Sequence, residues 1–316
     1  MFAGLRLSTL GQFTPEFPDA EALHMGLAKW NRRRLAVQTP SGDWQARLNE
    51  DLRMLRLEGG FVEAFRAHVA DLVADIPADP DRFIAWFEAL KASGPGQWDP
   101  LFGWLEADAD LEQMKWFLTQ EAAGEAGFDD LVAMTQVKLP ARAKLELARN
   151  YWDEMGRGAM PGMHGPMLDR TVQGLGLRPT IEGTLWQSLA LANLMTAFAT
   201  TRRYAYQSVG ALGVVELSAP TRVSCVDAGL KRLGCAPDTS EVFRPARPSG
   251  RRALGRVERG SAGPAGQRRP KLRAVHRRGR RHAPDLRRAV LRNLSRAPVG
   301  ARPSGGLRGG VGVRLR

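Results

Sequence analysis

The composition of the chain changes abruptly near residue 240, and this break limits which part can fold. Residues 1–240 carry 24 basic and 30 acidic side chains, whereas residues 241–316 carry 22 basic and three acidic ones. Arg, Gly, Ala and Pro make up 49 of the last 76 residues. Such a segment cannot bury enough apolar surface to offset its chain entropy. Only the first 240 residues, with all eight Trp and all ten Met, can build a core.

Helical periodicity dominates residues 19–233, and strand-like alternation is nearly absent. Parallel α/β folds need strands between their helices, so the sequence predicts an all-α bundle. We expect an irregular N-terminus over residues 1–18, a helical domain over 19–240 and a low-complexity basic tail over 241–316. No internal repeat is visible, which argues against a solenoid.

Capping residues, glycines and prolines predict where the helices begin and end. Asp43 is expected to cap a helix that ends at Gly59-Gly60, and Asp79-Pro80 to start another. The other predicted helices include Phe61 to Ile76, Asp110 to Lys138, Ala141 to Met155, Gly183 to Tyr206, Gly210 to Leu217 and Ala219 to Leu233.

Several classes of protein are excluded by what the sequence does not contain. No run of 18 apolar residues occurs, so no membrane span and no membrane partner are expected. The N-terminus lacks the pattern of a signal peptide. Cys225 and Cys235 match no zinc spacing and form no disulfide framework. Two free thiols are typical of a reducing cytoplasm.

Three carboxylates follow one another at helical spacing in the longest predicted helix. Glu121, Glu125 and Asp129 fall at i, i+4 and i+8, where like charges repel by a few tenths of a kcal/mol per pair. Carboxylates on facing bundle helices are a usual way to hold two iron or manganese ions. The alternative is a solvated acidic face.

Two further acidic residues stand out downstream. Glu154 lies at the end of its predicted helix, before Gly156-Arg157-Gly158, where an acid opposes the helix dipole. His164 follows, and a lone histidine is more often a hydrogen-bonded packing residue than a ligand. Glu216 sits in an apolar helix and needs a partner, for which we expect a structural salt bridge with Arg203.

Several long motifs together resemble a known family. They are Gln120-Glu121…Phe128-Asp129-Asp130-Leu131-Val132-Ala133, Leu147 through Gly158 with Met163-His164, and Arg202-Arg203-Tyr204-Ala205-Tyr206 through Glu216-Leu217. From about Asn31 to Gly234 the chain resembles bacterial iron-containing redox enzymes of the haem-oxygenase-like di-iron oxidase/oxygenase superfamily. The resemblance implies a haem-oxygenase-like bundle that binds two non-haem iron ions, without haem, and uses O₂ to oxidise a small-molecule substrate.

The resemblance also implies metal ligands at particular positions. Glu121 matches the glutamate of the first core helix, and Glu154 matches the glutamate that precedes a Gly-x-Gly turn in the second. The family often has a histidine seven residues after the first glutamate, but this chain has Phe128 there. Glu125 or Asp129 could substitute, and the sequence leaves this choice open.

The third core helix of the family carries His-x₃-Asp-x₂-His, which is absent here. Arginines and prolines replace it from Pro245 onward, and His276 and His282 lie too far along the chain. A GC-rich gene read out of frame gives such a tail, so we expect a reading-frame shift near residue 240 and weak or no activity. The alternative is a non-catalytic helical protein whose natural basic arm binds nucleic acid or anionic surfaces.

Overall fold

The computed structural model describes residues 20–70, 74, 76–94, 97–124 and 127–243. Helices make up its regular structure, and the described residues contain no strand beyond one isolated bridge. The α-helices are α1 (Ala20–Leu35), α2 (Trp44–His68), α3 (Pro80–Ser93), α4 (Pro100–Ala107), α5 (Leu111–Gly124), α6 (Phe128–Thr135), α7 (Ala141–Glu154), α8 (His164–Leu175), α9 (Trp186–Thr200) and α10 (Ala205–Arg232). The all-α prediction is therefore confirmed for the described residues. The expected N-terminus over 1–18 and the tail from residue 244 lie outside the described residues.

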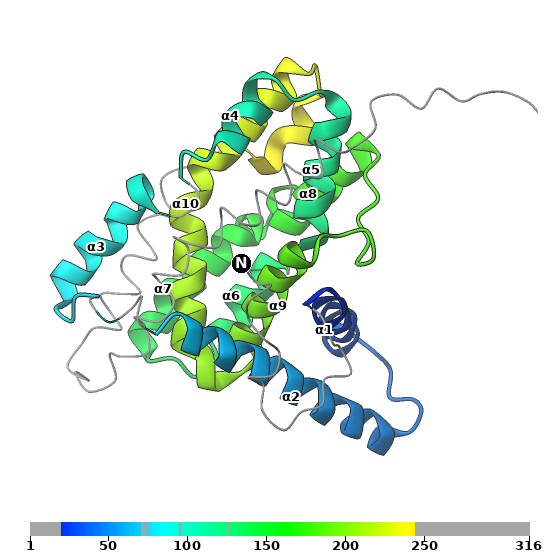
Figure 1. The fold of residues 1–316 in the computed structure, drawn as a ribbon, viewed down its shortest axis with the longest axis vertical. Helices are drawn as coiled ribbons and strands as arrows, with labels where there is room; N and C mark the ends of the chain where they lie inside the picture. The colour runs from blue at the N-terminus through cyan, green and yellow to red at the C-terminus, as the bar shows by residue number, and fades with distance from the viewer. Residues whose placement is uncertain (1–19, 71–73, 75, 95–96, 125–126, 244–316) are drawn as a thin grey trace, which may run out of the picture.

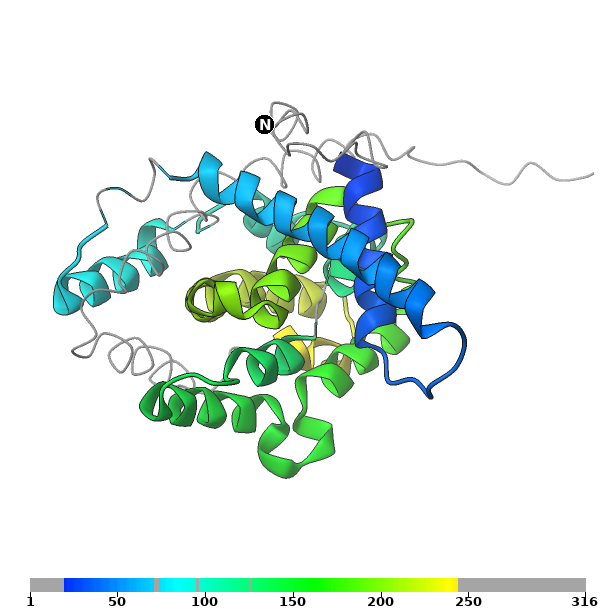
Figure 2. The same ribbon diagram turned by 90° about the horizontal axis from the view of Figure 1, so that it is seen from below.

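Helix α10 lies in the middle of the bundle and joins its two hydrophobic clusters (Figures 1 and 2). Its first half contributes Val209 and Leu212 to a cluster with α1, α2, α6, α7 and α9. Its second half contributes Val226 and Leu230 to a cluster with α4, α5 and α8. Burial of these apolar side chains from both ends of one long helix is what ties the bundle together.

Close approach of two helices explains a glycine in the second half of α10. A Cβ atom at Gly229 would lie 2.3 Å from the backbone oxygen of Leu105 in α4 and 2.7 Å from the side chain of Met114. Only a residue without a side chain lets α10 and α4 pack at this distance.

By length and composition alone, one helical stretch of the described residues, Arg202–Arg232, could cross a membrane. The buried core helix of a bundle passes the same test, and this stretch contains α10, which other helices surround (Figure 2). Its apolar character is accounted for by its place between the two clusters.

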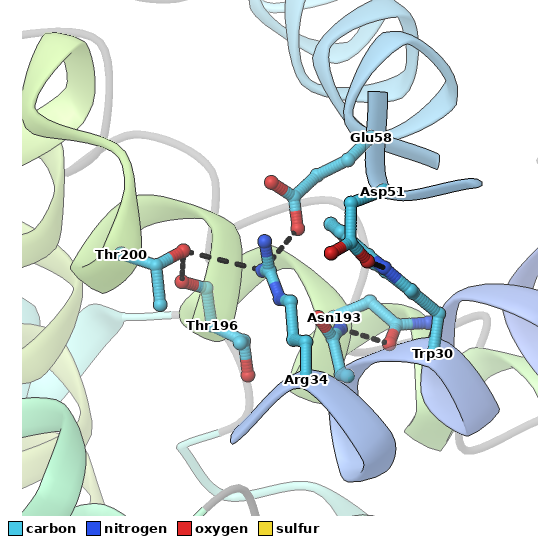
Figure 3. A network of polar contacts seen from close by, with 8 residues as sticks. Trp30, Arg34, Asp51, Glu58, Asn193, Thr196 and Thr200 are labelled. Carbon is cyan, nitrogen blue, oxygen red and sulfur yellow. Dashed lines mark hydrogen bonds and ion pairs between the residues drawn. The ribbon is translucent and has the colours of Figure 1, made fainter. Parts of the chain in front are cut away.

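A polar network joins α1 to α2 and α9 inside the bundle (Figure 3). Arg34 donates to Glu58 at 2.7 Å and to Thr200 at 3.2 Å, and its guanidinium lies 3.7 Å from the ring centroid of Trp30. Asn31 donates to the Asn193 side-chain oxygen at 3.0 Å. These bonds fix the position of α1, because buried polar groups are costly unless they are paired.

The two predicted helix caps, Asp43 and Asp79, are confirmed, but several of the other predicted starts and breaks are wrong. The carboxylates of Asp43 and Asp79 accept backbone N–H groups at the starts of α2 and α3. Helix α2 runs straight through Gly59-Gly60, since buried side chains on both sides hold it in place. Likewise α10 continues through Pro220, where two shorter helices were expected.

Candidate metal centre

The predicted carboxylate stripe does not lie on one helix. The continuous helix expected from Asp110 to Lys138 is wrong, because α5 ends at Gly124 and α6 begins at Phe128. Gly127 between them has φ +71°, in the left-handed region that stops a helix. Glu121 and Asp129 therefore belong to separate helices, and Glu125 lies outside the described residues.

Glu121 lies on the outer side of α5. Its side chain is exposed, so it does not face the bundle interior as expected. The inward residue of this turn is Gln120, which is buried, donates to the Gly183 carbonyl at 3.2 Å and accepts the Leu185 N–H at 2.8 Å. The amide of Gln120 thus fastens α5 to the segment that leads into α9.

Two aspartates occupy the first turn of α6. Asp129 is partly buried and Asp130 is exposed, and the positive end of the helix dipole favours both charges. Partial desolvation, and then the negative charge of Asp129, raise the pKa of the Asp130 carboxyl. Asp129 therefore stays a candidate metal ligand next to Phe128, which occupies the position where the family often has a histidine.

Glu154 is brought beside His164 by the loop between α7 and α8. The chain reverses through the glycines after Glu154, and Met155 and Met163 form an antiparallel bridge. The residues flanking this bridge therefore meet, with Glu154 Oε2 3.6 Å from His164 Nδ1. The Glu154 side chain is only 15% exposed, so this pair is largely shielded from water.

His164 also lies against Phe128, with 6.4 Å between the ring centroids. The spacing in the sequence gave no reason to join these two residues, and His164 was expected to be a packing residue. The turn between α7 and α8 is the signal that could have predicted the contact of Glu154 with His164, because the glycines of residues 156–162 bring His164 back to the end of α7.

Glu216 is not paired with Arg203, and that prediction is wrong. Arg203 instead donates to Glu63 in α2 at 3.0 Å. Glu216 is partly buried against α7, where it is hydrogen-bonded to Asn150 and close to Asp153. Burial raises the pKa of the Glu216 carboxyl, the Asp153 charge adds to this rise, and the Asn150 hydrogen bond opposes it.

The side chains present do not fit a complete two-iron site. Among the described residues, no three His, Cys, Asp or Glu side chains are grouped as metal ligands. Glu154 and His164 bring two candidate donors together, whereas Asp153, the acid near Glu216, is paired with Arg157 at 2.7 Å. Two donors leave most positions of an iron ion unfilled. His276 and His282 of the tail lie outside the described residues.

One of the comparisons with known proteins gives a match within the helical part of the chain. No curated protein sequence matches the chain. A family model described as iron-containing redox enzyme matches residues 115–244, a range that contains Glu121, Glu154, His164 and Glu216. The match confirms the resemblance of this chain to the haem-oxygenase-like iron-containing redox enzymes.

Proposed function

We propose that this chain derives from a non-haem di-iron oxidase or oxygenase that acts on a small molecule with O₂, and that it binds iron only weakly as it stands. The observation that carries the proposal is the pair of Glu154 and His164, whose carboxylate oxygen and ring nitrogen lie 3.6 Å apart, with the Glu154 side chain only 15% exposed. Asp153, the acid near Glu216, already pairs with Arg157 at 2.7 Å, so its charge is balanced without a metal ion.

The family match supports the coarser statement that the fold is that of an iron-containing redox enzyme. Carboxylate and imidazole groups are suitable ligands for non-haem iron. Glu154 and His164 are candidate donors that lie close together, and Glu216 is a further candidate. Glu121, Glu125 and Asp129 remain proposed ligands on the strength of the resemblance.

Anaerobic titration with Fe(II) tests the proposal directly. We expect less than one tightly bound iron per chain, because the His-x₃-Asp-x₂-His ligands of the family's third core helix are missing. Glu154→Gln and Glu216→Gln should each weaken the residual binding about 10-fold or more if they remove a ligand. Glu121→Gln tests the assignment that rests on the resemblance alone.

Glu112→Gln is the matched control, because Glu112 is an exposed acid of α5 whose side chain pairs with Lys115 one turn later. Its iron affinity should equal that of the parent chain. If the Gln variants at 121, 154 and 216 all bind iron as the parent does, the proposed ligands are wrong. Near-stoichiometric tight iron in the parent chain would contradict the claim of an incomplete site.

A further inference from the structure

Exposed large apolar side chains are concentrated at one end of the molecule. Six of the thirteen found among the described residues fall between residues 35 and 55. We call them the apolar ridge: Leu35, Val37, Trp44, Leu48, Leu52 and Leu55. Val37 is fully exposed and Trp44 is 68% exposed. Single exposed apolar residues are ordinary, but a contiguous set of this size marks an interaction surface.

The ridge is a regular helix face rather than a scatter of side chains. Trp44, Leu48, Leu52 and Leu55 follow at i, i+4, i+8 and i+11, which places them along one side of α2. No residue of α2 before Met54 is buried. This half of α2 extends beside the end of α1, to which the loop carrying Val37 connects it (Figure 1).

The acids of this helix half already have partners, and two of the three are tied to α1. Asp51 accepts from the indole N–H of Trp30 at 2.7 Å, and Glu50 forms an ion pair with Arg33 at 2.8 Å. Asp43 is used as the helix cap. The charges of Asp51 and Glu50 are thus engaged by α1, and Asp51 lies at the edge of the ridge, one turn from Leu48 and Leu55.

Arginines also border the ridge. Residues 32–56 contain six arginines and three acids, in contrast to the acidic balance of residues 1–240. Arg47 and Arg56 are exposed, and helical geometry puts them on opposite sides of the line from Trp44 to Leu55. The ridge is therefore a basic, apolar end on an otherwise acidic helical domain.

This charge pattern decides between possible occupants. Two copies packed ridge to ridge would bring the same arginines together, so self-association is opposed by like charge. A lipid surface needs only an apolar helix face with Trp and Leu and basic residues at its margin. The sequence argued against a membrane partner because it has no apolar run long enough to span a bilayer. A helix that lies flat on a membrane surface needs no such run.

We propose that the apolar ridge docks this protein on an anionic membrane surface. Trp44, Leu48, Leu52 and Leu55 enter the boundary between headgroups and acyl chains, with Leu35 and Val37 beside them. Arg47 and Arg56 extend to the lipid phosphates, their aliphatic parts covering the apolar margin. This docking is independent of the iron site, since the ridge lies on α1 and α2 and the candidate metal donors lie on other helices.

Co-sedimentation of the full chain with vesicles tests the proposal. The basic tail is common to the parent and all variants, so the ridge is tested by the difference between the parent and the ridge variants on phosphatidylglycerol-containing vesicles, not by binding of the parent alone. The double variant Trp44→Ser/Leu48→Ser should lose about 10-fold or more in partitioning. Arg47→Glu/Arg56→Glu, which keeps the apolar face, should lose about fivefold per arginine on anionic vesicles only.

Trp152→Ser is the matched control, because Trp152 is also an exposed tryptophan, 55% exposed, but lies on α7. It should bind vesicles as the parent does, and circular dichroism should show that all variants remain helical. Equal binding by the parent and the ridge variants would overturn the proposal, as would no binding by the parent. A parent dimer that Trp44→Ser/Leu48→Ser makes monomeric, without vesicle binding, would assign the ridge to a second copy instead.

Discussion

At the scale of single residues, the polar groups buried between α1, α2 and α9 carry more consequence than their sequence context suggests. Glu58 reads as an ordinary helix acid before two glycines, yet it is 3% exposed and pairs with Arg34 (Figure 3). Burial raises the pKa of Glu58 and lowers the pKa of Arg34, against their mutual attraction. The cost of removing both charges from water thus offsets the stabilisation that their attraction provides.

Arg34→Met should lower the free energy of unfolding by about 3–5 kcal/mol, because it leaves the Glu58 charge buried without its partner. The double variant Arg34→Met/Glu58→Met should recover most of that loss, since it removes both charges. Urea denaturation at neutral pH measures these differences. Arg33→Met is the control, because its pair with Glu50 is exposed and contributes at most about 1 kcal/mol. A double variant no more stable than Arg34→Met would contradict this account.

His24 predicts how stability changes with acidity. It is buried in α1, stacks on Trp186 and meets Phe61 edge-on, and burial lowers its pKa to about 3. The unfolded chain binds a proton at His24 below about pH 6.5, whereas the folded chain does not until about pH 3. Stability from this group is therefore complete above about pH 6.5 and declines as pH falls, by up to about 1.4 kcal/mol per unit.

His24→Leu should remove this contribution to the slope of unfolding free energy against pH between about 6 and 4. Urea titrations at several pH values give the slope for each variant, and the slope is informative even if Leu changes the absolute stability. An unchanged slope in His24→Leu would show that His24 is protonated in the folded protein as readily as in the unfolded one.

At the scale of helices, the sequence predicts starts better than ends. Asp43 and Asp79 cap their helices because a carboxylate beside free N–H groups is a local interaction. Whether a glycine ends a helix depends on packing that the local sequence does not contain. Gly59 lies inside α2 because buried neighbours hold the helix, whereas Gly127 takes a positive φ and divides α5 from α6. That division is why the predicted acidic stripe did not form.

Gly127→Ala should lower the free energy of unfolding by about 1 kcal/mol, because a side chain there must adopt the left-handed region at φ +71°. Gly103→Ala is the matched control, since Gly103 lies within α4 and a Cβ there meets nothing within 4 Å. It should raise stability by up to about 1 kcal/mol through its higher helix propensity. Urea midpoints compare the two. Equal effects of the two substitutions would show that the break at Gly127 tolerates a side chain without strain.

At the scale of the whole molecule, helical periodicity was enough to predict the all-α fold of the described residues. The candidate site was less predictable, since contacts such as Glu154 with His164 and Glu216 with Asn150 join residues from separate helices. A helical pattern shows which residues share a face, but not which faces meet. The long motifs indicated which family the chain resembles, and the structure showed which residues lie next to each acid.

The end of the family match at residue 244 coincides with the change in composition, and both support a shifted reading frame. Sequencing the encoding DNA around codon 240 tests this. Another frame should encode His-x₃-Asp-x₂-His within a helical pattern, and the chain rebuilt in that frame should bind iron far more tightly, because the added ligands complete the site. If neither other frame encodes this pattern, the tail is a natural arm. It should then bind nucleic acid without sequence preference, and the affinity should fall steeply as salt rises.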